Sequence, residues 1–388
     1  MTPRAATTSV FFINGAMVGT WVAHIPYVQD RLGVSKATIG VALLCMALGA
    51  LVSMPITGQI LHRRPSARVV RVAALVYCLL GPLPVIAPSP AALCALLVVF
   101  GAFNGAMDVS MNAHGVAVER ELGKPIMSSL HAGWSFGGFF AAGAASLATA
   151  AGVEARAETA ATTVVLWLAA LVVTARLGSA STHDEEAAAG FALPSRGVLL
   201  LGALCVIAMV VEGSMNDWSG IYLRHNLGAG AAAASLGFAG FSLGMALCRV
   251  GGDKVNERIG PKALLRGGML MVAASLGALL LIAEPVPAVI GFTLVGLGVA
   301  NGVPVIFSAA GRVPPSGPSL SAVFTIGYSG FLAGPPLLGV LADAIGLPTT
   351  LGLVCVAALV VAALAGVALG AGDRAAARAA VATPAPGR

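Results

Sequence analysis

An aspartate, Asp108, stands inside the apolar stretch VVFGAFNGAMDVSMNAHG, with Asn104 and Asn112 four residues to either side. In an α-helix, residues four apart lie on the same face, so these three polar side chains would form one stripe. Amide groups donate and accept hydrogen bonds, and a carboxyl group can take up and release a proton. The stripe could therefore bind a hydroxylated solute and carry a proton, or it could only join this helix to a neighbour through hydrogen bonds.

The composition decides in which solvent this stripe lies. The 388 residues are 58% hydrophobic and only 10% charged, whereas soluble proteins carry about 25% charged residues. Apolar runs of about 20 residues, long enough to cross the bilayer as helices, alternate with short polar breaks. We expect an all-α polytopic membrane protein. The net charge of +6 is then a matter of membrane orientation rather than of nucleic-acid binding.

The apolar runs predict twelve transmembrane helices in two halves. The N-terminal half covers residues 1–177, a polar cytoplasmic linker covers 178–196, the C-terminal half covers 197–370, and a disordered cytoplasmic tail covers 371–388. The predicted spans are 9–30, 37–61, 67–87, 90–118, 128–151, 159–178, 197–223, 231–251, 263–283, 286–310, 319–342 and 347–370.

Basic residues indicate the orientation of these spans. If the N-terminus is cytoplasmic, 18 of the 22 Lys and Arg residues fall on the cytoplasmic side, and the exceptions are Arg31, Lys36, Arg156 and Arg224. Cytoplasmic loops of membrane proteins carry this excess of positive charge. We therefore expect both termini to be cytoplasmic, in the inner membrane of a bacterium.

The two halves resemble each other at an offset of about 195 residues. Three matching pairs occur in the same order: Leu32-Gly33 with Leu227-Gly228, Asn104-Gly105 with Asn301-Gly302, and Gly133-Trp134-Ser135 with Gly327-Tyr328-Ser329. Two six-helix halves joined by a long loop are typical of secondary transporters, which handle their substrate between the halves near the middle of the membrane.

The chain resembles the major facilitator superfamily over nearly its whole length. The superfamily's loop motif, roughly G-x-x-x-D-R-x-G-R-K, is matched after the second span by Gly58, Arg63 and Arg64, although His62 replaces the aspartate. Arg258 and Gly260 fit the equivalent loop of the second half. Three further stretches, AMDVSMNAHG, SLHAGWSFGG and GYSGFLAGPPLLG, resemble the MosC-like, rhizopine-related branch of bacterial permeases. The resemblance implies transport by alternating access, by a chain expected to act as a monomer.

Polar residues inside the spans are the candidates for function, because placing them in hydrocarbon is costly. We expect Asp108, Glu212 and His131 to couple transport to protons, although His131 could instead only cap or pack. Arg249 and Asp253, four residues apart, are interpreted as an ion pair at the cytoplasmic gate. The predicted substrate-binding residues are Asn14, Trp21, Asn104, Asn112, Trp134, Asn216, Asn301 and Tyr328.

The sequence favours a proton-coupled transporter for a small sugar- or polyol-like solute. The alternative is a proton-driven efflux antiporter for hydrophobic or cationic compounds, since buried acids suit that function too. No H-E-x-x-H zinc motif and no G-x-x-x-x-G-K-[ST] nucleotide loop occurs, and the six cysteines stand singly. We therefore expect no enzyme activity, no cofactor and no metal site.

Overall fold

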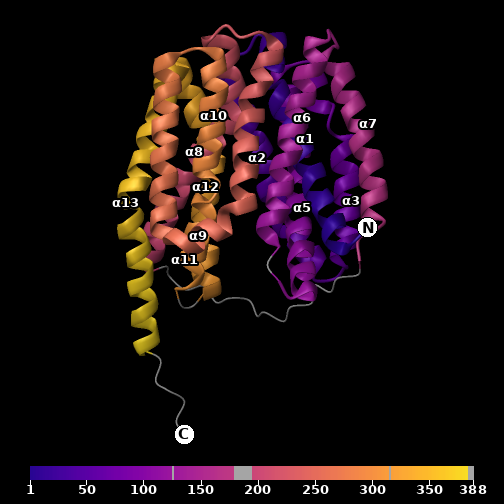
Figure 1. Ribbon diagram of the computed structural model, residues 1–388. Helices are drawn as coiled ribbons and strands as arrows, with labels where there is room; N and C mark the ends of the chain where they lie inside the picture. The colour runs from indigo at the N-terminus through magenta and orange to yellow at the C-terminus, as the bar shows by residue number, and fades with distance from the viewer. Residues whose placement is uncertain (125, 179–194, 314–315, 383–388) are drawn as a thin grey trace.

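The computed structural model describes residues 1–124, 126–178, 195–313 and 316–382, and every regular element in these ranges is a helix (Figure 1). The side chains of residues 252–254, 316–318, 321 and 372–382 lie outside this description. Most of the predicted linker, residues 179–194, lies outside it as well.

The helices form two groups that follow each other along the chain. The first group is α1 (Pro3–Leu32), α2 (Lys36–Leu61), α3 (Ser66–Leu79), α4 (Leu83–Ile86), α5 (Pro90–Leu122), α6 (Met127–Ala150) and α7 (Ala155–Thr174). The second group is α8 (Arg196–Ile221), η1 (Tyr222–Asn226), α9 (Ala231–Ile282), α10 (Pro285–Val299), α11 (Gly302–Gly311), α12 (Ser316–Ile345) and α13 (Leu347–Ala382).

These helices supply twelve membrane-length segments in the described part of the chain. Eleven are long and apolar enough to span a bilayer, with α3–α4 and α10–α11 each forming one span and α9 forming two. The twelfth is α6, which has 24 residues and whose His, Trp, Ser and Gly residues reduce its hydropathy. The predicted twelve-helix fold is confirmed.

Glycine explains how α9 supplies two spans. Gly260 has φ 79° and ψ 161° and is followed by Pro261, so the helix breaks between these residues. Glycine adopts positive φ without steric cost, and proline cannot donate a backbone hydrogen bond to the preceding turn. The break lies near the start of the second of the two spans that α9 supplies, Ala231–Gly251 and Val255–Ile282, which are close to the predicted 231–251 and 263–283.

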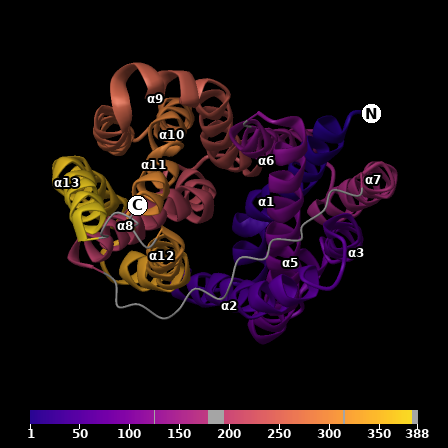
Figure 2. The same cartoon turned by 90° about the horizontal axis from the view of Figure 1, so that it is seen from below.

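The two groups meet along two pairs of helices. Within the first group, α1 packs on α6 and α2 packs on α5, whereas α6 packs on α9 and α2 packs on α12 across the groups. Figure 2 shows the groups facing each other, with α6 and α9 on one side and α2 and α12 on the other. A glycine permits the close approach of α1 to α6, because a Cβ on Gly15 would lie 1.9 Å from the carbonyl oxygen of Trp134.

The last helix is longer than predicted. We expected disorder over residues 371–388, but α13 continues to Ala382. Its final residues are mostly alanine, which has the strongest intrinsic helix propensity. Residues 383–388 lie outside the described part of the chain.

Candidate substrate cavity

A cavity of about 500 Å³ lies between the two groups of helices. Helices α1, α2, α5 and α6 line it from one side, and α8, α9 and α12 line it from the other. Its polar lining residues are Asn14, Asn104, Asp108, His131, Trp134, Glu212, Asn216, Asp217, Arg249, Thr325, Tyr328 and Ser329. Apolar residues, among them Met46, Met54, Met111, Phe331 and Leu332, form the rest of the wall.

A chain of hydrogen bonds joins three helices on the first side of the cavity. The indole Nε1 of Trp134 donates to Asn14 Oδ1 over 2.7 Å, and Asn14 Nδ2 donates to Asn104 Oδ1 over 3.3 Å. Because an indole N–H can only donate, it fixes which end of the Asn14 amide faces Asn104. The close contact at Gly15 brings α1 near enough to α6 for this bond. The chain holds three predicted substrate-binding residues in fixed orientations.

Asp108 faces the cavity, but Asn112 does not. The Asn112 amide donates to the Asp108 backbone oxygen over 2.8 Å and to its carboxylate Oδ1 over 3.1 Å. We predicted substrate binding for Asn112, yet its position one turn along α5 makes it the group that orients the Asp108 carboxylate. The spacing of four residues brings the pair together, as the sequence suggested, but it serves contact within the helix.

The side of the cavity that the second group of helices lines carries a largely buried charge pair, and this pair contacts both groups of helices. Arg249 Nη2 lies 3.8 Å from Glu212 Oε1, with side-chain exposures of 13% and 15%. Arg249 Nη1 also donates to Ser135 Oγ over 2.8 Å, and the Arg249 carbonyl accepts from Ser128 Oγ over 2.9 Å. Arg249 in α9 therefore joins Glu212 in α8 to α6 of the other group.

This placement changes the interpretation of Arg249. We expected it to pair with Asp253 at a gate, but it faces the cavity and contacts Glu212. The side chain of Asp253 lies outside the described residues. His131 also lines the cavity, where its ring packs edge-on against Phe11 at 5.2 Å.

Two further polar residues depart from the prediction. Asn301 sits at the break between α10 and α11, where its amide donates to Cys248 Sγ over 3.0 Å, and it does not line the cavity. Asp217, which was not among the predicted site residues, also lines the cavity. Arg224 pairs with Asp30 over 3.3 Å. The remaining predicted substrate-binding residues, Trp21, Asn216 and Tyr328, line the cavity.

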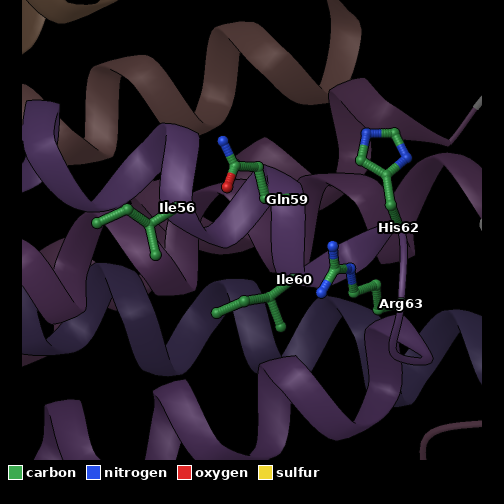
Figure 3. Close-up of a pocket in the computed structure, with 5 residues that line it drawn as sticks. All are labelled: Ile56, Gln59, Ile60, His62 and Arg63. Atoms are coloured by element: carbon green, nitrogen blue, oxygen red, sulfur yellow. The ribbon is translucent and has the colours of Figure 1, made fainter.

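Two residues of the first loop motif, His62 and Arg63, line a separate hollow. A pocket of about 360 Å³ is lined by Ile56, Gln59, Ile60, His62 and Arg63, from the end of α2 and the residues after it (Figure 3). None of them lines the central cavity. Gly58 lies in the same turns of α2, Arg63 and Arg64 are exposed, and Arg258 is exposed before the break at Gly260.

The cavity is closed at one end of the bundle. We call the end at which α7 finishes and α8 begins the junction end, and the other the opposite end. At the opposite end, Asp343 of α12 accepts from the backbone N–H groups of Lys36 (3.1 Å) and Ala37 (2.8 Å) at the start of α2. Together with the Asp30–Arg224 pair, this contact joins the two groups of helices.

Exposure differs along the cavity lining. Trp21, Leu43 and Pro335, toward the opposite end, are buried, whereas Leu51 and Thr325, nearer the junction end, are exposed. The lining residues nearer the junction end are thus more exposed than those toward the opposite end.

The sequence pattern missed a buried acid outside this cavity. Glu158 falls one residue before the predicted sixth span, but α7 begins at Ala155 and buries it, with 7% exposed. Thr162, which follows it by four residues on the same side of the helix, was the available signal, because its hydroxyl donates to the Glu158 carboxylate over 2.7 Å.

Comparisons with known proteins agree with this architecture. The chain is 35% identical over 366 residues to an uncharacterized MFS-type transporter of Yersinia pestis, covering 93% of this chain and 94% of the relative. It is 34% identical to the uncharacterized transporter y4wD of Sinorhizobium fredii, covering 89% of this chain and 92% of that one. It is also 34% identical to the membrane protein MosC of Rhizobium meliloti, covering 87% and 83%.

Solved structures share the fold at low sequence identity. A bacterial homolog of the human lysosomal transporter Spinster, in an inward-facing and unoccupied conformation, superposes with a TM-score of 0.76 at 14% identity, covering 96% of this chain and 97% of that one. A mutant of the nucleoside transporter NupG superposes with a TM-score of 0.73 at 12% identity, covering 95% and 100%. No protein-family model matches the chain. Full-length similarity to an MFS-type transporter, together with the twelve-helix fold, shows that the chain belongs to the major facilitator superfamily of transporters.

Proposed function

We propose that the protein is a proton-coupled secondary active transporter for a small sugar- or polyol-like solute. The observation that carries the proposal is the position of the Asp108 carboxylate. It faces the same cavity as the Trp134–Asn14–Asn104 hydrogen-bond chain, and Asn112 orients it from behind. A proton carrier and a set of amide and indole groups thus meet in one space between two helix groups, where alternating access would expose them to each side in turn.

The proposal includes an orientation in the bacterial cytoplasmic membrane. The junction end, next to which the basic residues Arg63, Arg64, Arg176 and Arg196 lie, is cytoplasmic, and the more exposed part of the cavity lining then lies toward the cytoplasm. Reporter fusions at Ala187, in the predicted linker, test this orientation. A cytoplasmic reporter should be active there, and an active periplasmic reporter would contradict the proposal.

The apolar part of the cavity wall favours a second candidate, a proton-driven efflux antiporter for hydrophobic or cationic compounds. Three acids, Asp108, Glu212 and Asp217, line the cavity beside one arginine, Arg249, while methionines and phenylalanine supply a deformable apolar surface. A cation with an apolar body would suit this wall. The two candidates differ in ligand chemistry, so a thermal-shift screen of the purified protein with sugars, polyols and cationic dyes separates them, since a ligand stabilises the state that binds it.

Asp108→Asn tests the coupling role directly. Asparagine keeps the size and the hydrogen bond from Asn112 but cannot titrate. In proteoliposomes, with a solute identified by the screen, the variant should lose proton-driven accumulation and keep counterflow exchange, which need not release a proton. Glu154→Gln, an exposed change at the start of α7, is the control and should keep both activities. Normal accumulation by Asp108→Asn would remove Asp108 from the coupling role.

A further inference from the structure

A second pair of titratable side chains lies buried away from the central cavity. His24 of α1 and Glu158 of α7 are 3.2 Å apart, between Nε2 and Oε2, with side-chain exposures of 4% and 6%. Neither residue lines the cavity. Helices α1 and α7 are in contact, and Figure 2 shows α7 at the outer edge of the first group, away from the second group.

Hydrogen bonding requires this pair to hold a proton. His24 Nδ1 lies 2.8 Å from the backbone oxygen of Thr20. A carbonyl can only accept, so Nδ1 must carry a hydrogen. Nε2 then faces a carboxylate oxygen, and the contact is attractive only when one more proton lies between them, on either atom. The second carboxylate oxygen, Oε1, accepts from Thr162 Oγ1 over 2.7 Å, so the carboxyl group is held in place from behind.

The pair lies behind the part of α1 that closes the opposite end of the cavity. On the other face of α1, the Ala23 carbonyl accepts from Ser235 Oγ of α9 over 3.3 Å. Pro26 packs on Gly220 of α8, where an added Cβ would lie 3.3 Å from the proline ring. Residues 23–26 therefore contact the second group of helices, while His24 in the same turn contacts α7. Anchoring His24 to α7 fixes the position of this sealing segment.

We infer that His24 and Glu158 form a proton-binding site outside the central cavity, and that the bound proton anchors the sealing segment of α1 to α7. When the proton leaves, a buried carboxylate faces an imidazole lone pair, and the anchor becomes repulsive. The proton concentration on the side of the membrane that faces the opposite end of the bundle would thereby control how firmly the cavity is closed at that end. This inference needs no assumption about the transported solute.

The helices around the pair carry other titratable groups. Helix α3 packs on both α1 and α7, and its titratable side chains are those of Arg68, Arg71, Tyr77 and Cys78. At the start of α7, Glu154, which directly precedes the helix, pairs with Arg156 over 3.6 Å, and both are exposed. On α1, the Tyr27 ring lies edge-on to His24 at 6.4 Å, and Asp30 pairs with Arg224 and His225 of the second group. The short helix α4, which packs on both α1 and α7, has the sequence LPVI and carries no titratable side chain. Because His225 also carries a titratable ring, the test must remove the proton site alone.

Glu158→Gln removes the proton site alone, because the glutamine amide can donate permanently to His24 Nε2 while its oxygen still accepts from Thr162. The measurement is the thermal unfolding midpoint of the purified protein from mildly acidic to alkaline pH. The wild-type midpoint should fall by several degrees on the alkaline side, and that of Glu158→Gln should stay nearly level. His114→Asn is the matched control: this histidine is equally buried but pairs with the neutral Ser66 hydroxyl at 3.0 Å. It should keep the wild-type alkaline fall.

Parallel profiles for the wild type and Glu158→Gln would overturn the inference. The double variant His24→Phe, Glu158→Leu covers the case in which the glutamine variant does not fold, because it removes both polar groups together. Its profile should also be level, and an alkaline fall as large as that of the wild type would equally overturn the proton site. Since the readout is stability without any solute, failure here leaves the proposed transport function untouched.

Discussion

The buried pair of Arg249 and Glu212 makes a quantitative prediction: removing one charge should cost the fold more than removing both. The single variants are Arg249→Gln and Glu212→Gln, and the double variant carries both changes. Each single change leaves the partner charge at 13% or 15% exposure without its counter-ion. The double variant leaves two neutral amides that can hydrogen-bond to each other and to Ser135.

The separation of the two charges sets the size of this effect. Two unit charges 3.8 Å apart attract by about 4 kcal/mol at an effective dielectric constant of about 20. Breaking a buried pair by removing one partner typically costs about 3–5 kcal/mol, whereas replacing both partners is often nearly neutral. Water in the cavity screens the pair, so we expect a coupling free energy of about 2–4 kcal/mol from the double-mutant cycle.

The assay is reversible unfolding in mixed detergent micelles for the four proteins of the cycle. The double variant should be more stable than the sum of the single changes predicts, by the coupling free energy given above. As a control, the same cycle on the exposed pair Arg156 and Glu154 should show only about 0–1 kcal/mol of coupling. Additive effects at Arg249 and Glu212, within about 0.5 kcal/mol, would refute the view that this ion pair stabilises the fold.

Three further predictions concern hydrogen bonds and backbone. Trp134→Phe leaves the buried Asn14 oxygen without its donor and should add about 1–3 kcal/mol to the cost of the smaller ring, measured by the same unfolding assay. Trp21→Phe should cost only the lost packing, because the Trp21 indole nitrogen is buried without a partner among the described residues. Asp343→Ala removes an acceptor that caps α2 across the two groups of helices, which is worth about 1 kcal/mol. In a background without native cysteines, a cysteine placed at Leu43 should then be labelled about five times faster from the side of the opposite end. An unchanged labelling rate would contradict a sealing role for Asp343. Gly260→Ala forces a side chain into positive φ and should cost about 1–2 kcal/mol, whereas Gly143→Ala, in a helical position with open space around it, should be neutral or stabilising.

The fold could be predicted from composition and periodicity because the bilayer imposes strict requirements on length and polarity. Twelve apolar runs became twelve membrane-length helices, and the glycine and proline at 260 and 261 marked a true break. The predictions failed at the ends of spans, where the bilayer no longer requires a given length and polarity. The alanine-rich end of α13 is helical through local propensity, and Glu158 escaped attention because the apolar run that marks its helix begins after it.

The site could be predicted only as far as a single helix determines it. The spacing of Asn104, Asp108 and Asn112 placed all three along α5, but a helix face about 100° wide does not reveal which of its residues reaches the cavity and which turns back to its own helix. Asn104 bonds outward to Asn14, whereas Asn112 bonds to Asp108.

Contacts between distant helices were beyond the reach of the pattern altogether. Arg249 and Glu212 are 37 residues apart in the sequence, and Arg249 had a plausible partner four residues away in Asp253. A local partner is favoured in an isolated helix. Between packed helices, however, a guanidinium can also gain from a carboxylate and a hydroxyl on neighbouring helices that share its low-dielectric surroundings. The position of Arg249 within the bundle, and not its spacing along the chain, therefore selects Glu212 and Ser135 as its partners.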